Sequence, residues 1–98
     1  MSGFSERHPY SVLLTHLRRM RLESGLTQVE LAKAWGTSQA VISKIERGER
    51  RLDLVEFISL CRAMGLPEQE QLSQLLVDFD ALPARSWLLL RGISSEPE

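Results

Sequence analysis

The sequence predicts an all-α domain, and three observations support that prediction. Apolar residues recur at the three- and four-residue spacing of helices, and no sustained alternation typical of strands occurs before residue 83. Residues that start and end helices punctuate these segments at short intervals. The length of 98 residues, with 43% apolar and 26% charged residues, is that of one globular domain.

The first predicted helix covers residues 11–24, after an N-terminal arm over residues 1–10. An apolar stripe with helical spacing runs along it: Val12, Leu13, Leu17 and Met20, with Leu14 beside them. Gly25 follows this segment, and glycine readily adopts the left-handed conformation that ends many helices. A helix ending at Ser24 is therefore expected.

The next two helices are predicted over residues 28–35 and 39–47. Thr27 stands three residues before Glu30, the spacing at which the two side chains cap a helix start reciprocally. Gly36 ends this helix, and Ser38 is a favourable N-cap for the following one. A connection of about three residues, 36–38, therefore joins the two short helices, and Gly48 ends the second one.

Two further helices and an ambiguous segment complete the chain. Asp53 and Glu56 form a second capping pair before a helix that Gly65 and Pro67 end. The fifth helix begins at Pro67 and presents one apolar stripe: Leu72, Leu75, Leu76 and Phe79. Residues 83–93 carry no usable period and fit a helix or a strand; helix is favoured. A short polar tail, expected to be disordered, covers 94–98.

The predicted helix over 39–47 has two chemically different faces. On a helical wheel one face is small, polar and cationic: Gln39, Ala40, Ser43, Lys44 and Arg47. Apolar residues dominate the other face: Val41, Ile42 and Ile45, with Glu46 at its edge. Amide, hydroxyl and ammonium groups are suited to base edges and phosphates. An ordinary surface helix would show the same division, so the wheel leaves both interpretations open.

The net charge of −1 conceals an uneven distribution. Residues 1–65 carry a formal charge of +3, and residues 66–98 carry −4. Arg47, Arg50 and Arg51 lie within five residues, a density expected of a patch that contacts phosphates. A solvated charged face would have the same composition. The distribution nevertheless removes the objection that a near-neutral chain is unsuited to nucleic acid.

Residues 17–66 closely resemble the phage Cro and repressor-type (XRE-like) helix-turn-helix family. The resemblance covers about half the chain and rests on residues at family spacing: Leu26-Thr27-Gln28, Glu30-Leu31-Ala32, Gly36, Ser38-Gln39, Ile42-Ser43, Ile45-Glu46 and Gly48. It implies a five-helix lambda-repressor-like domain with a short C-terminal extension. Residues 11–66 would then form the DNA-binding domain, and the helix over 39–47 would enter the major groove.

The resemblance also implies roles for individual residues. It places five residues at positions facing the groove: Ser38, Gln39, Ala40, Ser43 and Lys44. Four more are expected to contact phosphates: Gln28, Arg47, Arg50 and Arg51. Gln28 can also brace the recognition helix, and Gln39 is the strongest candidate for reading a base because its amide can bond adenine N6 and N7 together.

Four residues are expected to serve the fold. Arg21 and Glu46 match a family pair that joins the first and third helices as a structural ion pair. Trp35 replaces the aliphatic residue commoner before the turn glycine and is expected to fill core volume. Cys61 occupies a core position on the fourth helix, and a buried thiol is inert unless its pKa is lowered.

The residues after 66 include more apolar side chains than one small DNA-binding domain should bury. Members of this family usually dimerise to read two half-sites about 34 Å apart. Residues 67–93 are therefore expected to hold the fifth helix and an oligomerisation segment, with dimer contacts from Trp87, Leu88, Leu89 and Leu90. Val55 and Ile58 offer further apolar surface, whereas Leu72, Leu75 and Leu76 are expected to close the core.

These observations predict a sequence-specific DNA-binding transcriptional regulator, most simply a repressor, acting as a homodimer on a two-fold symmetric operator in double-stranded DNA. The alternative is an antitoxin or adaptor whose C-terminal segment captures a partner protein.

The remaining inventory indicates no enzyme, cofactor or metal. The only histidines are His8, in the expected loose N-terminus, and His16, expected on a helix surface; nucleotide-binding and metal motifs are absent. One cysteine makes no disulfide, and the longest apolar run is four residues. No membrane span and a cytoplasmic location are expected.

Overall fold

The computed structural model describes residues 5 and 7–90, and that part of the chain is helical, without a β-strand. Its helices are α1 (Pro9–Glu23), α2 (Gln28–Trp35), α3 (Gln39–Glu46), α4 (Leu54–Ala63), α5 (Glu68–Asp80) and a short 3-10 helix, η1 (Ala84–Trp87). Residues 88–90 continue η1 as α-helix, so the helix favoured over 83–93 is confirmed as far as residue 90. The expected disordered tail, 94–98, lies outside the described residues.

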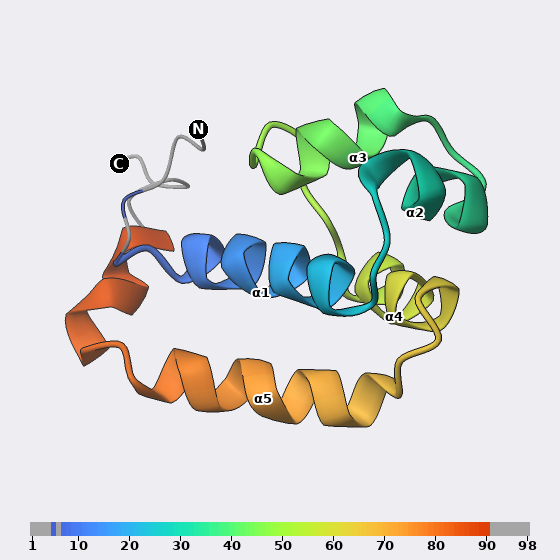
Figure 1. Cartoon of the computed structure of the whole chain (residues 1–98). Coiled ribbons are helices and arrows are strands. Elements are labelled where there is room, and N and C mark those ends of the chain that lie inside the picture. The colour runs from blue at the N-terminus through green and yellow to red at the C-terminus, as the bar shows by residue number, and fades with distance from the viewer. Residues whose placement is uncertain (1–4, 6, 91–98) are drawn as a thin grey trace.

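Helix α1 is the middle layer of the domain (Figure 1). Helices α2 and α3 lie on one side of it, α5 runs antiparallel on the other side, and α4 packs against both α2 and α5. Helices α2 and α3 of the basic half and α5 of the acidic half therefore lie on opposite sides of α1. This arrangement places the outer surface of α3 far from α5.

Local capping explains why α2 and α4 begin where they do. The Glu30 amide donates to the Thr27 hydroxyl at 3.0 Å, and the Thr27 amide donates to the Glu30 carboxylate at 2.9 Å. Asp53 and Glu56 make the equivalent two bonds at the start of α4. Each pair satisfies backbone N–H groups that a helix start leaves without partners, so both predicted capping boxes are confirmed.

The tight turn between α2 and α3 depends on Gly36. Its φ of 87° lies in the left-handed region, where a side chain would be strained. The Gly36 and Thr37 amides both donate to the Ala32 carbonyl, and Ser38 then caps α3 by accepting from the Val41 amide at 3.3 Å. The short connection fixes α3 across α2, as a helix-turn-helix requires.

Helix α1 begins at Pro9, two residues before the predicted start. Proline suits the first helical position because its fixed φ is already helical and its missing N–H had no partner there. His8 is the N-cap, and its Nδ1 accepts from the Tyr10 amide at 3.0 Å. The expectation that His8 lies in a loose N-terminus is therefore wrong: it is 6% exposed.

A single apolar core joins α1 to the other four α-helices. Its buried members include residues from every α-helix: Tyr10, Leu14, Leu17, Met20, Leu31, Ala32, Ile42, Ile45, Leu52, Phe57, Leu60, Cys61 and Leu75. Cys61 is fully buried, and burial raises the pKa of its thiol to about 11. The thiol is therefore un-ionised at neutral pH and serves packing, as expected.

The contact between α1 and α5 includes a buried histidine. His16 is 1% exposed, so its predicted place on the helix surface is wrong. Its Nδ1 accepts from Arg19 at 2.9 Å, and Arg19 also pairs with Asp78 of α5 at 3.1 Å. The apolar stripe on α1 did not predict this burial, because α5 covers a second face of α1 that lies outside the stripe. Burial is the main cause that lowers the pKa of His16.

Helix α5 closes the core less completely than predicted. Leu75 is 4% exposed, but Leu72 and Leu76 are 37% and 52% exposed. The buried residues of α5 are Gln71 and Leu75, one turn apart, so the packed face of α5 is rotated towards Gln71 and away from Leu72 and Leu76. In the described residues, no helix is long and apolar enough to cross a membrane.

Candidate nucleic-acid interface

The outer face of α3 carries the residues predicted to face a DNA groove. Ser38, Gln39, Ala40 and Lys44 are exposed, and Ser43 is half-buried. Ile42 and Ile45 hold the opposite face against the core at 2% exposure each. Because packing fixes the rotation of α3, its polar face points to solvent in a defined direction.

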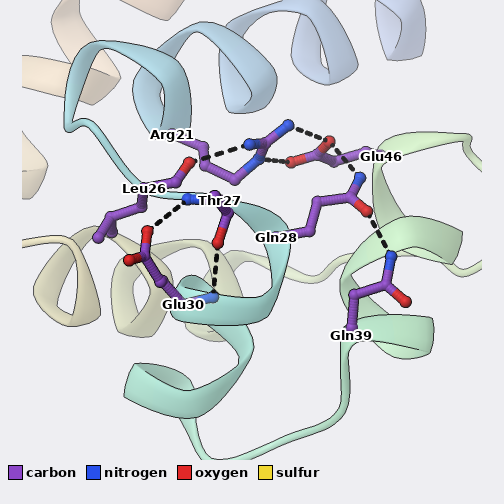
Figure 2. Close-up of polar contacts among 7 residues, drawn as sticks. All are labelled: Arg21, Leu26, Thr27, Gln28, Glu30, Gln39 and Glu46. Carbon is purple, nitrogen blue, oxygen red and sulfur yellow. Dashed lines mark hydrogen bonds and ion pairs between the residues drawn. The ribbon is translucent and has the colours of Figure 1, made fainter.

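A buried ion pair ties α3 to α1. Arg21 Nε donates to Glu46 Oε2 at 2.6 Å and Arg21 Nη2 donates to Glu46 Oε1 at 3.1 Å, a bidentate contact between side chains that are each 8% exposed (Figure 2). The third guanidinium nitrogen donates to the Leu26 carbonyl at 3.0 Å, just before α2. The pair predicted from the sequence thus lies at the junction of α1, α2 and α3, where it restrains the angle of α3.

Two glutamines extend this contact to the first turn of α3. Gln28 Nε2 donates to Glu46 Oε1 at 2.9 Å, and Gln39 Nε2 donates to Gln28 Oε1 at 2.7 Å. Figure 2 shows the resulting chain from Arg21 through Glu46 and Gln28 to Gln39. The last bond uses one side-chain N–H of Gln39, and the carbonyl oxygen and second N–H of this amide are not part of the chain. Gln28 braces α3 in this arrangement and uses one of its two side-chain N–H groups to do so.

Arg47 is engaged by its own chain. Its Nε and Nη2 donate to the two carboxylate oxygens of Glu49 at 3.0 and 3.1 Å, and its Nη1 donates to the Ser43 hydroxyl. The Arg47 hydrogen bond holds the pKa of Glu49 below its ordinary value. Ser43 and Arg47, predicted for base and phosphate contacts, therefore share one hydrogen-bonded cluster with an acid that sequence reasoning did not single out.

Arg50 and Arg51 are held in two different ways. Arg50 Nη2 donates to Glu56 Oε2 at 2.9 Å, which lowers the pKa of Glu56. The Arg51 guanidinium lies over the Tyr10 ring, with Cζ 4.8 Å from the ring centroid. In the part of the chain that the structure describes, Lys44 makes no ion pair, so its ammonium remains available to a phosphate or a base.

The turn region has one contact that the sequence did not indicate. Trp35 is partly buried against the core, and its indole N–H donates to the Ser59 hydroxyl of α4 at 2.9 Å. The ring therefore fills core volume and also fastens the end of α2 to α4. A polar partner for the indole could not be inferred because Ser59 lies 24 residues away.

The residues predicted for dimer contacts are exposed in η1 and just after it, beyond the C-terminal end of α5. The exposed fractions of Trp87, Leu88, Leu89 and Leu90 are 39%, 57%, 41% and 36%. The Trp87 ring packs edge-on against Phe79 of α5, with centroids 5.2 Å apart. Further exposed apolar side chains lie on α4 and α5: Leu54, Val55, Leu72, Leu76 and Val77.

Comparison with known proteins assigns the family. A family model described as "Helix-turn-helix" matches residues 17–71, more than half of the chain. An "Uncharacterized HTH-type transcriptional regulator y4dJ" of Sinorhizobium fredii is 36% identical over 56 residues, covering 57% of this chain and 73% of the relative. An "XRE-family like protein" from Pseudomonas syringae superposes with a TM-score of 0.66 at 42% identity, over 70% of this chain and 84% of the other. The chain therefore belongs to the XRE-like helix-turn-helix family of DNA-binding transcriptional regulators.

Proposed function

We propose that this protein is a sequence-specific transcriptional repressor that binds a two-fold symmetric operator as a homodimer. The observation that carries the proposal is the hydrogen-bonded chain that ends at Gln39. It orients an exposed amide on the outward face of α3, and a positioned amide can bond adenine N6 and N7. Ser38, Ala40, Ser43 and Lys44 share the base-reading surface in this proposal.

Phosphate contacts position α3 in the groove. Gln28, at the start of α2, and Arg47, Arg50 and Arg51, after α3, flank the recognition helix on both ends. A helix start attracts phosphate through its exposed N–H groups, and guanidinium groups bind phosphate bidentately. Repression then follows from occupancy of a promoter. The proposal includes no enzymatic activity and places the protein in the cytoplasm.

The homodimer rests on the apolar surface at Trp87, Leu88, Leu89 and Leu90. Four adjacent side chains that remain exposed in one copy would be covered in a dimer. They lie beyond α5 on a segment separate from α3, so a dimer formed through them need not use the recognition surface. Two copies related by a two-fold axis would present their α3 helices to half-sites about 34 Å apart.

A binding titration tests the base-reading role. Sites are first selected from a pool of random duplexes, and each variant is then titrated against the selected site and against single-base changes. Gln39→Ala is expected to lose discrimination at one base position by about 1 to 3 kcal/mol, whereas Arg50→Ala weakens binding to all sequences alike. Arg62→Ala removes the same charge from the C-terminal end of α4, outside the proposed DNA contacts, and is the control for loss of a positive charge. Equal losses on every sequence for Gln39→Ala and Arg50→Ala would overturn the base-reading role.

A second candidate function uses the same C-terminal surface differently. The four exposed residues 87–90 could hold a partner protein, which would make this an antitoxin or adaptor. Sedimentation equilibrium of the full chain separates the two: a dimer at micromolar concentration that Leu88→Ser and Leu89→Ser dissociate favours the homodimer. A monomer that forms a stoichiometric complex with a protein encoded next to it favours the adaptor.

A further inference from the structure

One side chain of α1 holds two consecutive residues of the loop that follows α3. Tyr10, 8% exposed, accepts a hydrogen bond at its hydroxyl from the Leu52 amide at 3.0 Å. The face of the same ring lies under the Arg51 guanidinium, 4.8 Å from Cζ to the centroid. These contacts span about 40 residues of sequence, so they fix the α3–α4 loop against the start of α1.

The peptide between Arg51 and Leu52 is restrained on both sides. The Arg51 carbonyl accepts from Arg50 Nη1 at 3.2 Å, and Arg50 is itself paired with Glu56 of α4. The Leu52 amide donates to Tyr10, and the Leu52 side chain is 8% exposed in the core. With its peptide and its guanidinium both located, Arg51 has few alternative conformations to lose when it binds a ligand.

Tyr10 is itself rigidly placed. It is the second residue of α1, follows Pro9, and donates its amide to the Nδ1 of the capping His8. Its ring therefore has a fixed direction relative to the first turn of the helix. An aromatic face attracts a guanidinium without contributing an ionised group of its own. The ring thus helps to place the Arg51 guanidinium and adds no charge of its own.

We infer that Tyr10 is a positioning residue for DNA binding, which places the Arg51 guanidinium for a phosphate beside the recognition helix. The inference rests on the proposed function, because it needs α3 to dock on DNA with its following loop at the backbone. Tyr10 acts through Arg51 and contacts no base. Its effect is therefore the same on every sequence and appears in the salt dependence of binding.

The test uses the full chain and a random-sequence duplex of about 30 base pairs, with binding measured across a salt series. Each phosphate contact contributes about 0.9 to the slope of log K against log salt. Tyr10→Leu removes both the ring face and the hydroxyl, so its slope is expected to fall by about 0.9 and its affinity by roughly three- to tenfold, as for Arg51→Ala. Combining the two substitutions is expected to add nothing to the slope change.

Tyr10→Phe is the conservative variant, since it restores the ring and removes only the hydroxyl. It is expected to regain the wild-type slope, while its melting temperature falls because the Leu52 amide loses its acceptor. Leu60→Val, a core substitution on α4, is the control for stability: it lowers the melting temperature and leaves the slope unchanged. Should Tyr10→Leu not fold, Arg51→Lys replaces it. Lysine keeps the charge but lacks the planar group that stacks on the ring, so it is expected to lose most of what Arg51→Ala loses.

Any of three results in single variants would overturn the inference. These are a wild-type slope in folded Tyr10→Leu, a wild-type slope in Arg51→Lys, and a reduced slope in Tyr10→Phe. Additive losses for Tyr10→Leu and Arg51→Ala would also contradict it, because the two residues would then act separately. Failure of the proposed function gives a different result, in which the wild-type chain shows no salt-dependent DNA binding at all.

Discussion

The α3 side and the α5 side of this domain differ in how their exposed side chains are held. On the α3 side, Gln28 and Gln39, both predicted to meet DNA, are tied through Glu46 to the structural partner Arg21. On the α5 side, apolar groups lie exposed without such ties, Val77 and Leu88 at 68% and 57%. The polar side chains of the α3 side are thus held in place without a bound partner, whereas the α5 side exposes apolar area that a partner would cover.

This difference matches what each kind of recognition requires. A base edge is read by hydrogen bonds whose direction matters, so an amide held in place loses less conformational freedom on binding than a mobile one. Apolar association has no such directional demand and scales with the area removed from water. Binding through the α3 side should therefore be sensitive to single polar substitutions. Association through the α5 side should be sensitive to loss of apolar area.

The largest effect is expected from Arg21→Ala. Glu46, whose side chain is 8% exposed beside Arg21, would lose its charge partner, and breaking a buried pair in this way costs about 3 to 5 kcal/mol of the free energy of unfolding. Urea or thermal denaturation measures the loss. The α3 side would lose its anchor to α1 at the same time, so the variant should also bind DNA weakly.

Arg62→Ala is the matched control for that prediction. Arg62 makes a similar two-bond contact with Glu68, but its side chain is 70% exposed, and exposed pairs contribute little. We expect its stability to stay close to that of the wild type. An unchanged melting temperature for Arg21→Ala would show that the Arg21–Glu46 contact does not hold α3 in solution.

The next effect concerns the α5 side. In the proposed homodimer, Trp87→Ala removes a large aromatic contact, and such residues commonly dominate interface energetics at about 2 kcal/mol or more. The dimer dissociation constant measured by sedimentation equilibrium should rise accordingly. Leu22→Ser is the control, because Leu22 is 56% exposed on α1 outside the proposed interface. Equal behaviour of the two variants would remove the special role of residues 87–90.

The helices of the α3 side were accessible to prediction because their signals are local. Thr27 with Glu30, Gly36 and Ser38 lie within twelve residues, and each acts on its own backbone or on a neighbouring turn. The Arg21–Glu46 pair came from a family pattern instead, since 25 residues separate the partners. Local chemistry thus sufficed for the elements, and a resemblance was needed for the contact between them.

Other features depend on packing geometry that no local pattern contains. His16 is buried because α5 covers that face of α1, and the stripe of apolar residues on α1 did not include it. Glu49 and Glu56 were not expected beside Arg47 and Arg50, because loop conformation decides which charges meet. Leu72 and Leu76 fitted a helical stripe, but the rotation of α5 towards Gln71 leaves both exposed.

A smaller effect is expected from pH. Burial, followed by Arg19, lowers the pKa of His16, although Asp78 and Gln71 on α5 and Glu23 on α1 oppose the shift. The unfolded chain therefore takes up a proton first, and the free energy of unfolding should fall as pH drops below about 6.5 towards the lower folded pKa. Denaturation between about pH 7 and pH 5 measures it.

Substituting the histidines divides that pH dependence. His16→Gln should flatten the curve, while His8→Asn keeps a capping side chain and removes the second histidine whose pKa is lowered, by burial and by Arg51. Each variant is expected to remove part of the slope, and the double variant most of it. A wild-type slope in the double variant would assign the pH dependence to other groups.

The smallest effect tests whether the hydrogen bonds that hold Arg47 on the α3 side weaken its binding to DNA. Glu49 holds Arg47 through two hydrogen bonds, so the carboxylate competes with any phosphate for the same guanidinium. Glu49→Gln should strengthen binding to all DNA sequences severalfold at low salt, and the gain should shrink as salt screens the charges. Glu70→Gln makes the same charge change on α5 and is expected to have less effect, because α5 lies on the other side of α1 from α3 (Figure 1). If the two variants bind DNA equally, net charge alone accounts for the gain, and Glu49 does not restrain Arg47 when DNA binds.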